Sequence, residues 1–324
     1  MPRTLRARRA RRPPTPDAKD ALTDSIPIVL NARSGAEGGR EDRRASIEAA
    51  FAAHGLQARF ELLREGEDIG EAVDALLAQG AQTIVAAGGD GTVNAVASRL
   101  LDRDTTLGVL PLGTLNHFAR DIGIPADLDG AARVIAQGHR VATDVGEVNG
   151  RYFLNNSSLG LYPRIVSERE HAQRHLGLGK WPALARATWH ALRHPSSFNA
   201  VVRIDGQDIE RRTPFIFVGN NCYVLEGFGM GRRTCLDDGV LSLNVLRPKS
   251  TLGFLWLGLR SLLGIGSHAG DFDQFETDGF EVRAQRGDDE VAVDGEVACM
   301  SSPMRYRIRK RALQVFAPLP KASR

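Results

Sequence analysis

The chain has 324 residues, of which 42% are hydrophobic and 25% are charged. These proportions are those of soluble globular proteins, and the length suits two domains. The net charge of +3 is unevenly placed. Residues 1–20 hold seven basic and two acidic side chains, a net of +5, so residues 21–324 carry a net of −2. The folded part of the chain is not basic, and we expect no nucleic acid among its partners.

The first 24 residues are rich in arginine and proline and poor in apolar residues, so we expect a disordered basic tail. The tail has no apolar segment of the kind found in secretory signals, although a transit peptide or a contact with anionic lipids stays open. The three cysteines, Cys222, Cys235 and Cys299, have neither metal-binding nor redox spacing. No apolar run reaches the roughly 18 residues of a membrane span, so we expect a cytoplasmic protein that is soluble or peripheral to a membrane.

The first half of the chain alternates predicted strands and helices. Strands are expected at 25–30, 58–62, 83–87 and 107–110, and helices at 41–54, 68–79 and 93–101. Gly55 and Gly80 follow the first two helices, where glycine commonly ends a helix. Strands separated by helices of this length form a parallel sheet. We therefore expect residues 25–145 to form a three-layer α/β domain that binds its ligand at the carboxyl ends of the strands.

After residue 145 the pattern changes to short apolar segments separated by turn residues. Asn149-Gly150 predicts a type I′ hairpin, because both central residues of this turn need positive φ. Further strands are expected at 201–204, 215–218, 240–245, 280–283, 291–293, 306–308 and 313–316. We expect residues 146–318 to form an antiparallel β-sandwich domain, with the last residues free to return to the first domain.

The most informative segment is Gly88-Gly89-Asp90-Gly91-Thr92, which follows an apolar strand and precedes a predicted helix. Glycines let backbone amides approach an anion closely, and a helix N-terminus adds unpaired N–H groups and a positive dipole end. An ordinary strand-to-helix turn has similar glycines, so the segment alone leaves both interpretations open. A second loop after the strand at 107–110 offers the hydroxyl of Thr114, while Asn116 and His117 are more typical of structural positions.

Two clusters of carboxylates occur in the second half. Asp237 and Asp238 precede a strand, and Asp294 and Glu296 follow one. If the strand continued through Gly295, Asp294 and Glu296 would share one side of it. Such a pair can supply a general base and a partner for Mg²⁺, although an Asp-Gly pair is more often a turn.

Six segments resemble, in order and spacing, those of the diacylglycerol kinase catalytic-domain family, and in particular its bacterial soluble lipid kinases. They begin at residues 31, 88, 111, 144, 236 and 293 and read NARSG, GGDGTVN, PLGTLNHFARDIGIP, DVGEVNGRYFLN, LDDGVLSL and VDGE. The likeness extends from about residue 26 to residue 318. GGDG by itself also occurs in NAD kinases and phosphofructokinases, so the combination carries the resemblance.

The resemblance implies an ATP-dependent, Mg²⁺-requiring kinase whose active site lies between the two domains. Backbone amides of the segment from Gly88 to Asn94 would hold the ATP phosphates. The implied nucleotide-binding residues are Asn31, Gly35, Gly88, Gly89, Asp90, Gly91, Thr92, Val93, Asn94 and Thr114. One of the carboxylates of Asp294 and Glu296, with Glu296 preferred, would take the proton from a lipid hydroxyl.

The resemblance also implies a structural Mg²⁺ ion. The backbone carbonyls of Cys235 and Val240 and the side chain of Asp238 match the family's ligands for this ion. Asp90 and Asp144 match acidic positions that connect the ion with the active site.

The chain departs from the family pattern in three places. Ala32 replaces a proline, Leu63 stands where a nucleotide-contacting threonine is expected, and residues 222–229 contain fewer glycines than usual. Leu63 puts one expected nucleotide contact in doubt, whereas the glycine-poor stretch weakens the acceptor side of the resemblance more than the ATP side.

We expect transfer of the γ-phosphate of ATP to a lipid hydroxyl, with diacylglycerol as acceptor and phosphatidic acid as product. A sphingoid-base kinase, another lipid-alcohol kinase and a non-catalytic nucleotide-binding regulator remain alternatives. The lipid would be met at a membrane surface, and a homodimer is left open. The amphipathic segment 251–264 suits a membrane face, but a helix packed on the β domain is the favoured interpretation. The basic, aromatic stretch 169–194 suits a membrane face or an exposed helix on the domain surface equally well.

Overall fold

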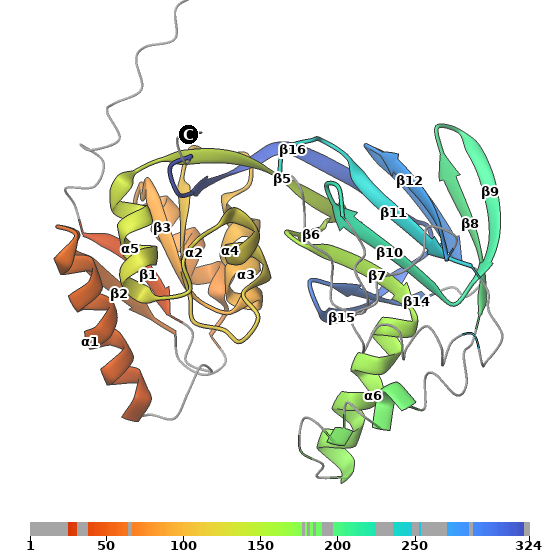
Figure 1. The fold of residues 1–324 in the computed structure, drawn as a ribbon, viewed down its shortest axis with the longest axis horizontal. Helices are drawn as coiled ribbons and strands as arrows, with labels where there is room; N and C mark the ends of the chain where they lie inside the picture. The colour runs from red at the N-terminus through yellow and green to blue at the C-terminus, as the bar shows by residue number, and fades with distance from the viewer. Residues whose placement is uncertain are drawn as a thin grey trace, which may run out of the picture.

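The computed structural model describes residues 25–30, 38–63, 67–176, 179, 182–183, 186–189, 197–223, 236–247, 253, 271–284 and 288–320. Figure 1 shows a layered α/β part and a part made of two packed layers of strands, joined by the long strands β5 (Arg140–Val148) and β16 (Met304–Phe316). None of the helices in these residues is long and apolar enough to cross a membrane.

The first part alternates strands and helices as the sequence predicts. Its elements are β1 (Ile26–Leu30), α1 (Gly38–Ala53), β2 (Ala58–Leu62), α2 (Ile69–Ala78), β3 (Thr83–Gly88), α3 (Asp90–Leu100), β4 (Thr106–Pro111), α4 (His117–Ile122) and α5 (Leu128–Gln137). The strands are parallel in the order β2-β1-β3-β4. The chain reverses its direction across the sheet after β2, so right-handed crossovers put α1 on one face and α2 and α3 on the other. The predicted three-layer domain is confirmed.

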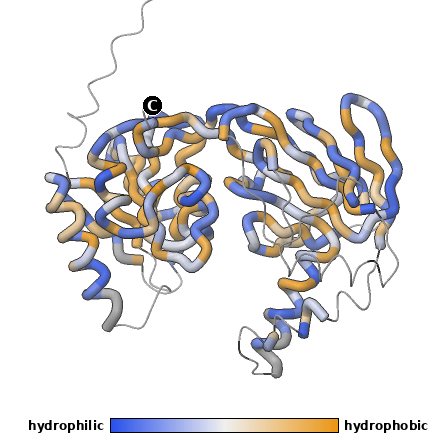
Figure 2. The backbone as a smooth tube through the Cα atoms, viewed as in Figure 1, coloured by the Kyte–Doolittle hydropathy of each residue, from blue (hydrophilic) through white to orange (hydrophobic). Residues whose placement is uncertain are grey.

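The burial of these strands agrees with helices on both faces. Every residue of β1, β3 and β4 is buried, which is typical of parallel strands covered on both sides. Figure 2 shows the corresponding run of hydrophobic segments through this part of the molecule. The carboxyl ends of β3 and β4 lie side by side, since Gly88 is in register with Pro111. This edge carries the two glycine-containing loops singled out in the sequence.

The second part contains most of the antiparallel strands. Besides β5 and β16, its elements are β6 (Arg151–Phe153), β7 (Asn156–Gly160), α6 (Leu161–Leu176), β8 (Phe198–Ile204), β9 (Gln207–Thr213), β10 (Phe215–Asn220), β11 (Leu241–Leu246), β12 (Phe272–Thr277), β13 (Gly279–Ala284), β14 (Asp288–Val293) and β15 (Glu296–Ser301). Asn149 and Gly150, with φ of 45° and 81°, form the predicted hairpin turn between β5 and β6.

Two sheets pack against each other in this part. One has the order β12-β11-β10-β7-β14-β15, and the other contributes β16-β13-β8-β9. Val218 and Leu243 of the first sheet share a core with Val202, Val282 and Met304 of the second. The predicted β-sandwich is confirmed.

The sheet with β16 continues from one part of the molecule into the other. The first half of β16 pairs with β13, whereas Gln314 and Val315 pair with Thr106 and Leu107 of β4. Leu313, Val315 and Phe316 lie in the core of the α/β part. The boundary expected at residue 145 falls inside β5, because β5 runs alongside β16 across the junction.

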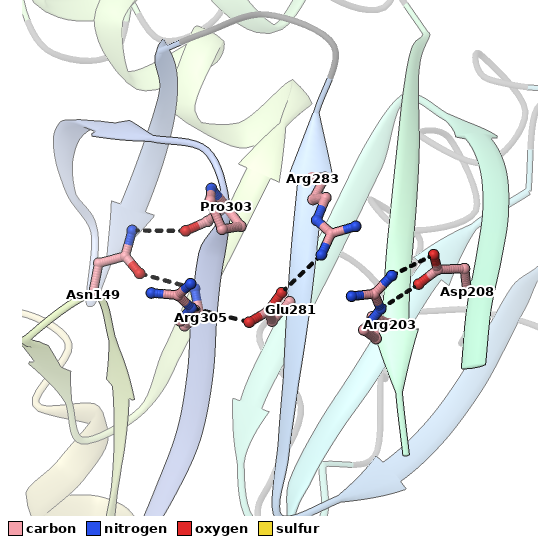
Figure 3. Close-up of polar contacts among 7 residues, drawn as sticks. All are labelled: Asn149, Arg203, Asp208, Glu281, Arg283, Pro303 and Arg305. Atoms are coloured by element: carbon pink, nitrogen blue, oxygen red, sulfur yellow. Dashed lines mark hydrogen bonds and ion pairs between the residues drawn. The ribbon is translucent and has the colours of Figure 1, made fainter. Parts of the chain in front are cut away.

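Figure 3 shows ion pairs between side chains on neighbouring strands of this sheet. Arg305 on β16 donates to Glu281 on β13 at 3.0 Å, and Arg203 on β8 binds Asp208 on β9 at 2.6 Å. The hydrogen bond from Arg305 lowers the pKa of Glu281, and that from Arg203 lowers the pKa of Asp208. Along these strands the charged residues alternate with apolar core residues, which is typical of an antiparallel sheet with one face exposed to solvent.

Candidate active site

The glycine-rich segment spans the end of β3, the N-cap Gly89 and the first turn of α3. The helix begins at Asp90, not at residue 93 as expected, so Asp90, Gly91 and Thr92 are helical. Gly88, Gly89 and Gly91 do not adopt positive φ. What matters is their missing β-carbon, since one on Gly88 would stand 2.5 Å from Oγ1 of Thr92.

A second loop packs directly on this turn. The amide of Leu112 donates to the carbonyl of Gly88 at 3.0 Å. A β-carbon on Gly113 would stand only 2.5 Å from Cα of Gly89, so the two backbones touch. Thr114 follows in this loop and is exposed. The structure therefore brings Thr114 and the first turn of α3 to one edge of the sheet.

Side chains of Asn116 and Asp90 hold this second loop in place. Asn116 has φ of 47°, accepts from the amide of Gly113 at 3.0 Å and donates to the carbonyl of Gly113 at 2.8 Å. Its side chain therefore stabilises its own loop and does not cap α4. Oδ1 of Asp90 accepts from the amide of Phe118 at 3.2 Å, which ties α3 to the start of α4.

The start of α3 has the properties of an anion site. The amide of Val93 already donates to the carbonyl of Gly89 at 3.1 Å, so it is used within the helix. The amides of Asp90 and Gly91 precede the first intrahelical hydrogen bond, and Gly89 has no side chain that could cap them. These amides, together with the helix dipole, favour a phosphate group at this end of α3.

The two candidate catalytic carboxylates lie on a tight turn rather than on a continuous strand. Asp294 and Gly295, with φ of 47° and 88°, connect β14 to β15. The strand therefore does not continue through Gly295, so the condition under which Asp294 and Glu296 would share one side of it is not met, and the Asp-Gly pair is a turn. The turn gives the two carboxylates different surroundings.

The carboxylate of Asp294 is surrounded by hydrogen-bond donors. Oδ1 accepts from the amides of Asn155 and Asn156, both at 2.9 Å. Oδ2 accepts from the amide of Leu154 at 2.8 Å and from Nδ2 of Asn94 at 2.6 Å. Because these donors occupy both oxygens, Asp294 holds the turn in place.

The side chain of Glu296 is exposed and lies at the start of α3. A β-carbon on Gly91 would stand 3.3 Å from Oε1 of Glu296. The hydroxyl of Tyr162, at the start of α6, lies close to the neighbouring Gly295, and burial raises the pKa of this hydroxyl. A carboxylate beside an anion site is the arrangement that a base for phosphoryl transfer needs.

A buried polar network runs from Asp294 to the loop before β11. The backbone amide of Asn220 donates to the carbonyl of Asn155 at 3.0 Å, and Nδ2 of Asn220 donates to the carbonyl of Asp144 at 2.8 Å. The carboxylate of Asp144 accepts from the amides of Gly239 and Arg311, each at 2.7 Å. Asp144 and Asn220 are at most 1% exposed. The network therefore connects the loop of the expected metal site with the turn that carries Asp294.

The sequence did not single out Asn220 and its neighbour Asn221. Oδ1 of Asn221 accepts from the amide of Gly239 at 3.1 Å, and both asparagines are fully buried. The sequence did contain a signal for these two residues, namely a pair of amide side chains at the end of an apolar strand. Such side chains must find hydrogen-bond partners when they are buried. It did not reveal which segments those partners come from.

The loop before β11 offers oxygen donors for the expected metal. Asp238 is exposed, and the carbonyl of Val240 accepts the amide of Asn221 at 2.9 Å, which leaves a second lone pair. Hard oxygen donors of this kind suit Mg²⁺. Both oxygens of Asp144 accept amides, so Asp144 shapes this loop. No cluster of three acidic, histidine or cysteine side chains occurs in the residues that the structure describes.

Several predicted residues lie outside the described residues. They include Asn31, Ala32, Gly35, Cys235, the expected tail 1–24, residues 224–229, the segment 251–264 apart from Gly253, and residues 177–178, 180–181, 184–185 and 190–194 of the stretch 169–194. Leu63 is buried in the core of the α/β part and has no polar group to offer a nucleotide.

Comparison with known proteins agrees with this architecture. Residues 25–148 match the family model "Diacylglycerol kinase catalytic domain". A protein named "Probable lipid kinase YegS-like" from Pseudomonas aeruginosa is 31% identical over 301 residues, which cover 91% of this chain and 95% of that protein. A relative of the same name from Yersinia enterocolitica is 35% identical over 70% of this chain and 77% of its own length.

The fold is shared with a solved structure. The crystal structure of a diacylglycerol kinase from Bacillus anthracis superposes with a TM-score of 0.67, covering 91% of this chain and 97% of its own at 21% identity. The fold combines an α/β part with a β-sandwich, and the family model and the relatives place the chain in the class of lipid kinases. The chain belongs to the diacylglycerol kinase catalytic-domain family.

Proposed function

We propose that the protein is an ATP-dependent lipid kinase and that Glu296 is its general base. The observation that carries the proposal is the position of the Glu296 carboxylate beside Gly91, in the first turn of α3. The names of the relatives, which describe lipid kinases, support a lipid as acceptor.

The amides of Asp90 and Gly91 and the dipole of α3 would hold and orient the transferred phosphate, with Thr114 at the nucleotide. Glu296 would take the proton of the acceptor hydroxyl as its oxygen bonds to the γ-phosphorus. The bond from that phosphorus to the bridging oxygen then breaks, and ADP leaves. In phosphoryl transfer such positioning and charge stabilisation supply most of the catalysis.

Mg²⁺ would neutralise phosphate charge, and the loop with Asp238 and Val240 would hold a structural ion. The carbonyl of Cys235 is the third ligand that the family resemblance implies. Asp144 would keep this loop in its shape through the amide of Gly239. Each oxygen ligand in this set is of the hard type that Mg²⁺ prefers.

We propose diacylglycerol as the acceptor, met at a membrane surface. The family model and the solved structure named for this activity support the choice. Trp189 is 54% exposed, and Arg186 on the same short helical stretch is also exposed. An exposed tryptophan beside a basic residue suits the interface of an anionic membrane.

The test is transfer of labelled phosphate from ATP with Mg²⁺ to a panel of lipids in mixed micelles. The panel contains diacylglycerol, monoacylglycerol, sphingosine and ceramide, and Glu296→Gln is the matched control. We expect labelled phosphatidic acid from the wild type and at least 100-fold less from Glu296→Gln, since a general base contributes that much. Labelled sphingosine phosphate instead of phosphatidic acid would show that the acceptor is a sphingoid base and not diacylglycerol. No labelled lipid would reject the kinase proposal and favour a nucleotide-binding regulator.

A further inference from the structure

Asn94 joins the nucleotide helix to the catalytic turn. It lies in α3 of the α/β part, whereas Asp294 lies 200 residues later, between β14 and β15. Nδ2 of Asn94 donates to Oδ2 of Asp294 at 2.6 Å and to the carbonyl of Tyr152 at 3.3 Å. This contact links α3 with the turn directly.

The side-chain amide of Asn94 is itself held in one orientation. The hydroxyl of Ser98, one helical turn further on, donates to Oδ1 of Asn94 at 2.9 Å. With Oδ1 accepting from Ser98, Nδ2 must face the carboxylate of Asp294, which can only accept. The arrangement therefore sets both the position and the polarity of the contact.

Gly91 and Asn94 share one face of α3. They are three residues apart, and side chains at this spacing are neighbours on a helix. The same face therefore carries the anion site at Gly91 and the contact that holds Asp294. Only Gly295 separates Asp294 from Glu296.

We propose that Asn94 is a positioning residue that sets the carboxylate of Glu296 against the phosphate site. Asn94 acts through Asp294 and the turn, and its side chain makes no contact with ATP. The inference rests on the proposed function, because it assigns Glu296 the role of base. It predicts that loss of Asn94 lowers kcat and leaves the affinity for ATP unchanged.

The test compares Asn94→Ala, Ser98→Ala and, as a matched truncation on the same helix, Arg99→Ala. Arg99 is exposed and pairs with Asp74 at 3.1 Å, away from the turn. We expect Asn94→Ala to lower kcat about 10- to 100-fold, because a misplaced catalytic group costs rates of this order. The KM for ATP should stay within about 2-fold of the wild type, since the substitution leaves the amides of the phosphate site in place. Ser98→Ala should lose about 3-fold in kcat, because it removes only the hydrogen bond that orients Asn94. Arg99→Ala should match the wild type.

Hydrogen–deuterium exchange of the intact proteins provides a readout that needs no activity. Peptides covering residues 290–300 should take up deuterium faster in Asn94→Ala than in the wild type and Arg99→Ala. If the wild type phosphorylated no lipid, the proposed function would fail, and the exchange measurement would still decide on the contact.

Unchanged exchange would overturn the inference, as would an unchanged kcat in an active enzyme. A raised KM for ATP with unchanged kcat would also overturn it, because Asn94 would then be a nucleotide contact. If Asn94→Ala did not fold, Asn94→Asp and its double variant with Asp294→Asn would carry the test. Asn94→Asp puts a carboxylate in place of the amide group whose Nδ2 lies 2.6 Å from Oδ2 of Asp294. The two carboxylates repel each other, so the double variant should recover at least about 5-fold in kcat over Asn94→Asp. No recovery would count against the inference.

Discussion

The carboxylate of Glu296 lies against Gly91, although the two residues belong to different layers of the molecule. Glu296 begins β15 of the sandwich, and Gly91 is in the first turn of α3. A β-carbon on Gly91 would stand 3.3 Å from Oε1 of Glu296, which is a tight contact. The absence of a side chain at Gly91 thus allows the proposed base and the proposed phosphate site to be adjacent.

Gly91→Ala should therefore lower activity without harming the fold. Alanine is the better helix former by about 1 kcal/mol, so the thermal midpoint should stay the same or rise. The added β-carbon should displace the Glu296 carboxylate and reduce kcat/KM by about 10-fold or more. Steady-state kinetics and thermal unfolding of the same preparation check both statements. Unchanged kcat/KM would show that Glu296 does not act from this position.

Asp294→Asn should lower the stability of the protein, whereas Glu296→Gln should lower its activity. Glu296 is exposed, so Glu296→Gln should lose about 10²- to 10⁴-fold in kcat and keep the wild-type thermal midpoint. Asp294→Asn turns an amide group toward backbone donors, and an unsatisfied buried donor costs about 1–3 kcal/mol. Denaturant unfolding of both variants tests the contrast. Equal loss of stability in the two would argue against a structural role specific to Asp294.

Asp144→Asn should destabilise the loop before β11. Each oxygen of this buried carboxylate accepts a backbone amide, so the variant leaves one of these donors facing an amide group. The free energy of unfolding should fall by about 1–3 kcal/mol. If the loop holds Mg²⁺, the protection of the wild type by added Mg²⁺ in thermal unfolding should be weaker in the variant. Equal stability of variant and wild type would contradict the structural role of Asp144.

Asp273 should make a pH-dependent contribution to stability. It closes one side of the sandwich by accepting from Arg211 at 2.9 Å and from Arg247 at 2.7 Å. Burial raises the pKa of Asp273, but the hydrogen bonds from Arg247 and Arg211 outweigh it, so the pKa is lowered on folding. A lowered pKa stabilises the fold above the unfolded value near 3.9, and this contribution is lost as the pH falls through the folded pKa.

Asp273→Asn should consequently unfold about 1 kcal/mol more easily than the wild type at pH 7. The difference should shrink as the pH falls below about 4, where the wild-type carboxyl also becomes neutral. Urea unfolding at several pH values measures it. A difference that stayed constant with pH would mean that packing, and not charge, is responsible.

Trp189→Ala should separate membrane contact from chemistry. With substrate in anionic vesicles, we expect about 5- to 10-fold less activity, because the proposed interfacial anchor is lost. With a water-soluble short-chain diacylglycerol, activity should equal that of the wild type. Vesicle sedimentation and the two assays check the prediction. Equal losses with both substrates would show that Trp189 supports the structure or the chemical step rather than membrane binding.

The sequence predicted the order and type of most elements, because local patterns carry that information. Buried parallel strands are continuous apolar runs, as in Thr83–Gly88, and the Asn149-Gly150 turn needs positive φ at both residues. Gly88, Gly89 and Gly91 indicated a close approach of two backbone segments, because the lack of a β-carbon is also a local property of the sequence. The start of α3 was placed three residues late, because Gly89 just before the helix and Gly91 in its first turn resemble a loop.

The tertiary structure alone decided the roles of the two carboxylates and the partner of Asn94. Asp294 and Glu296 are two residues apart in the sequence, yet a tight turn directs one to buried amides and leaves the other exposed beside Gly91. Asn94 and Asp294 are 200 residues apart and meet only because β5 and β16 hold the two parts of the molecule together. Local periodicity specifies elements, whereas contacts between distant segments depend on how those elements pack.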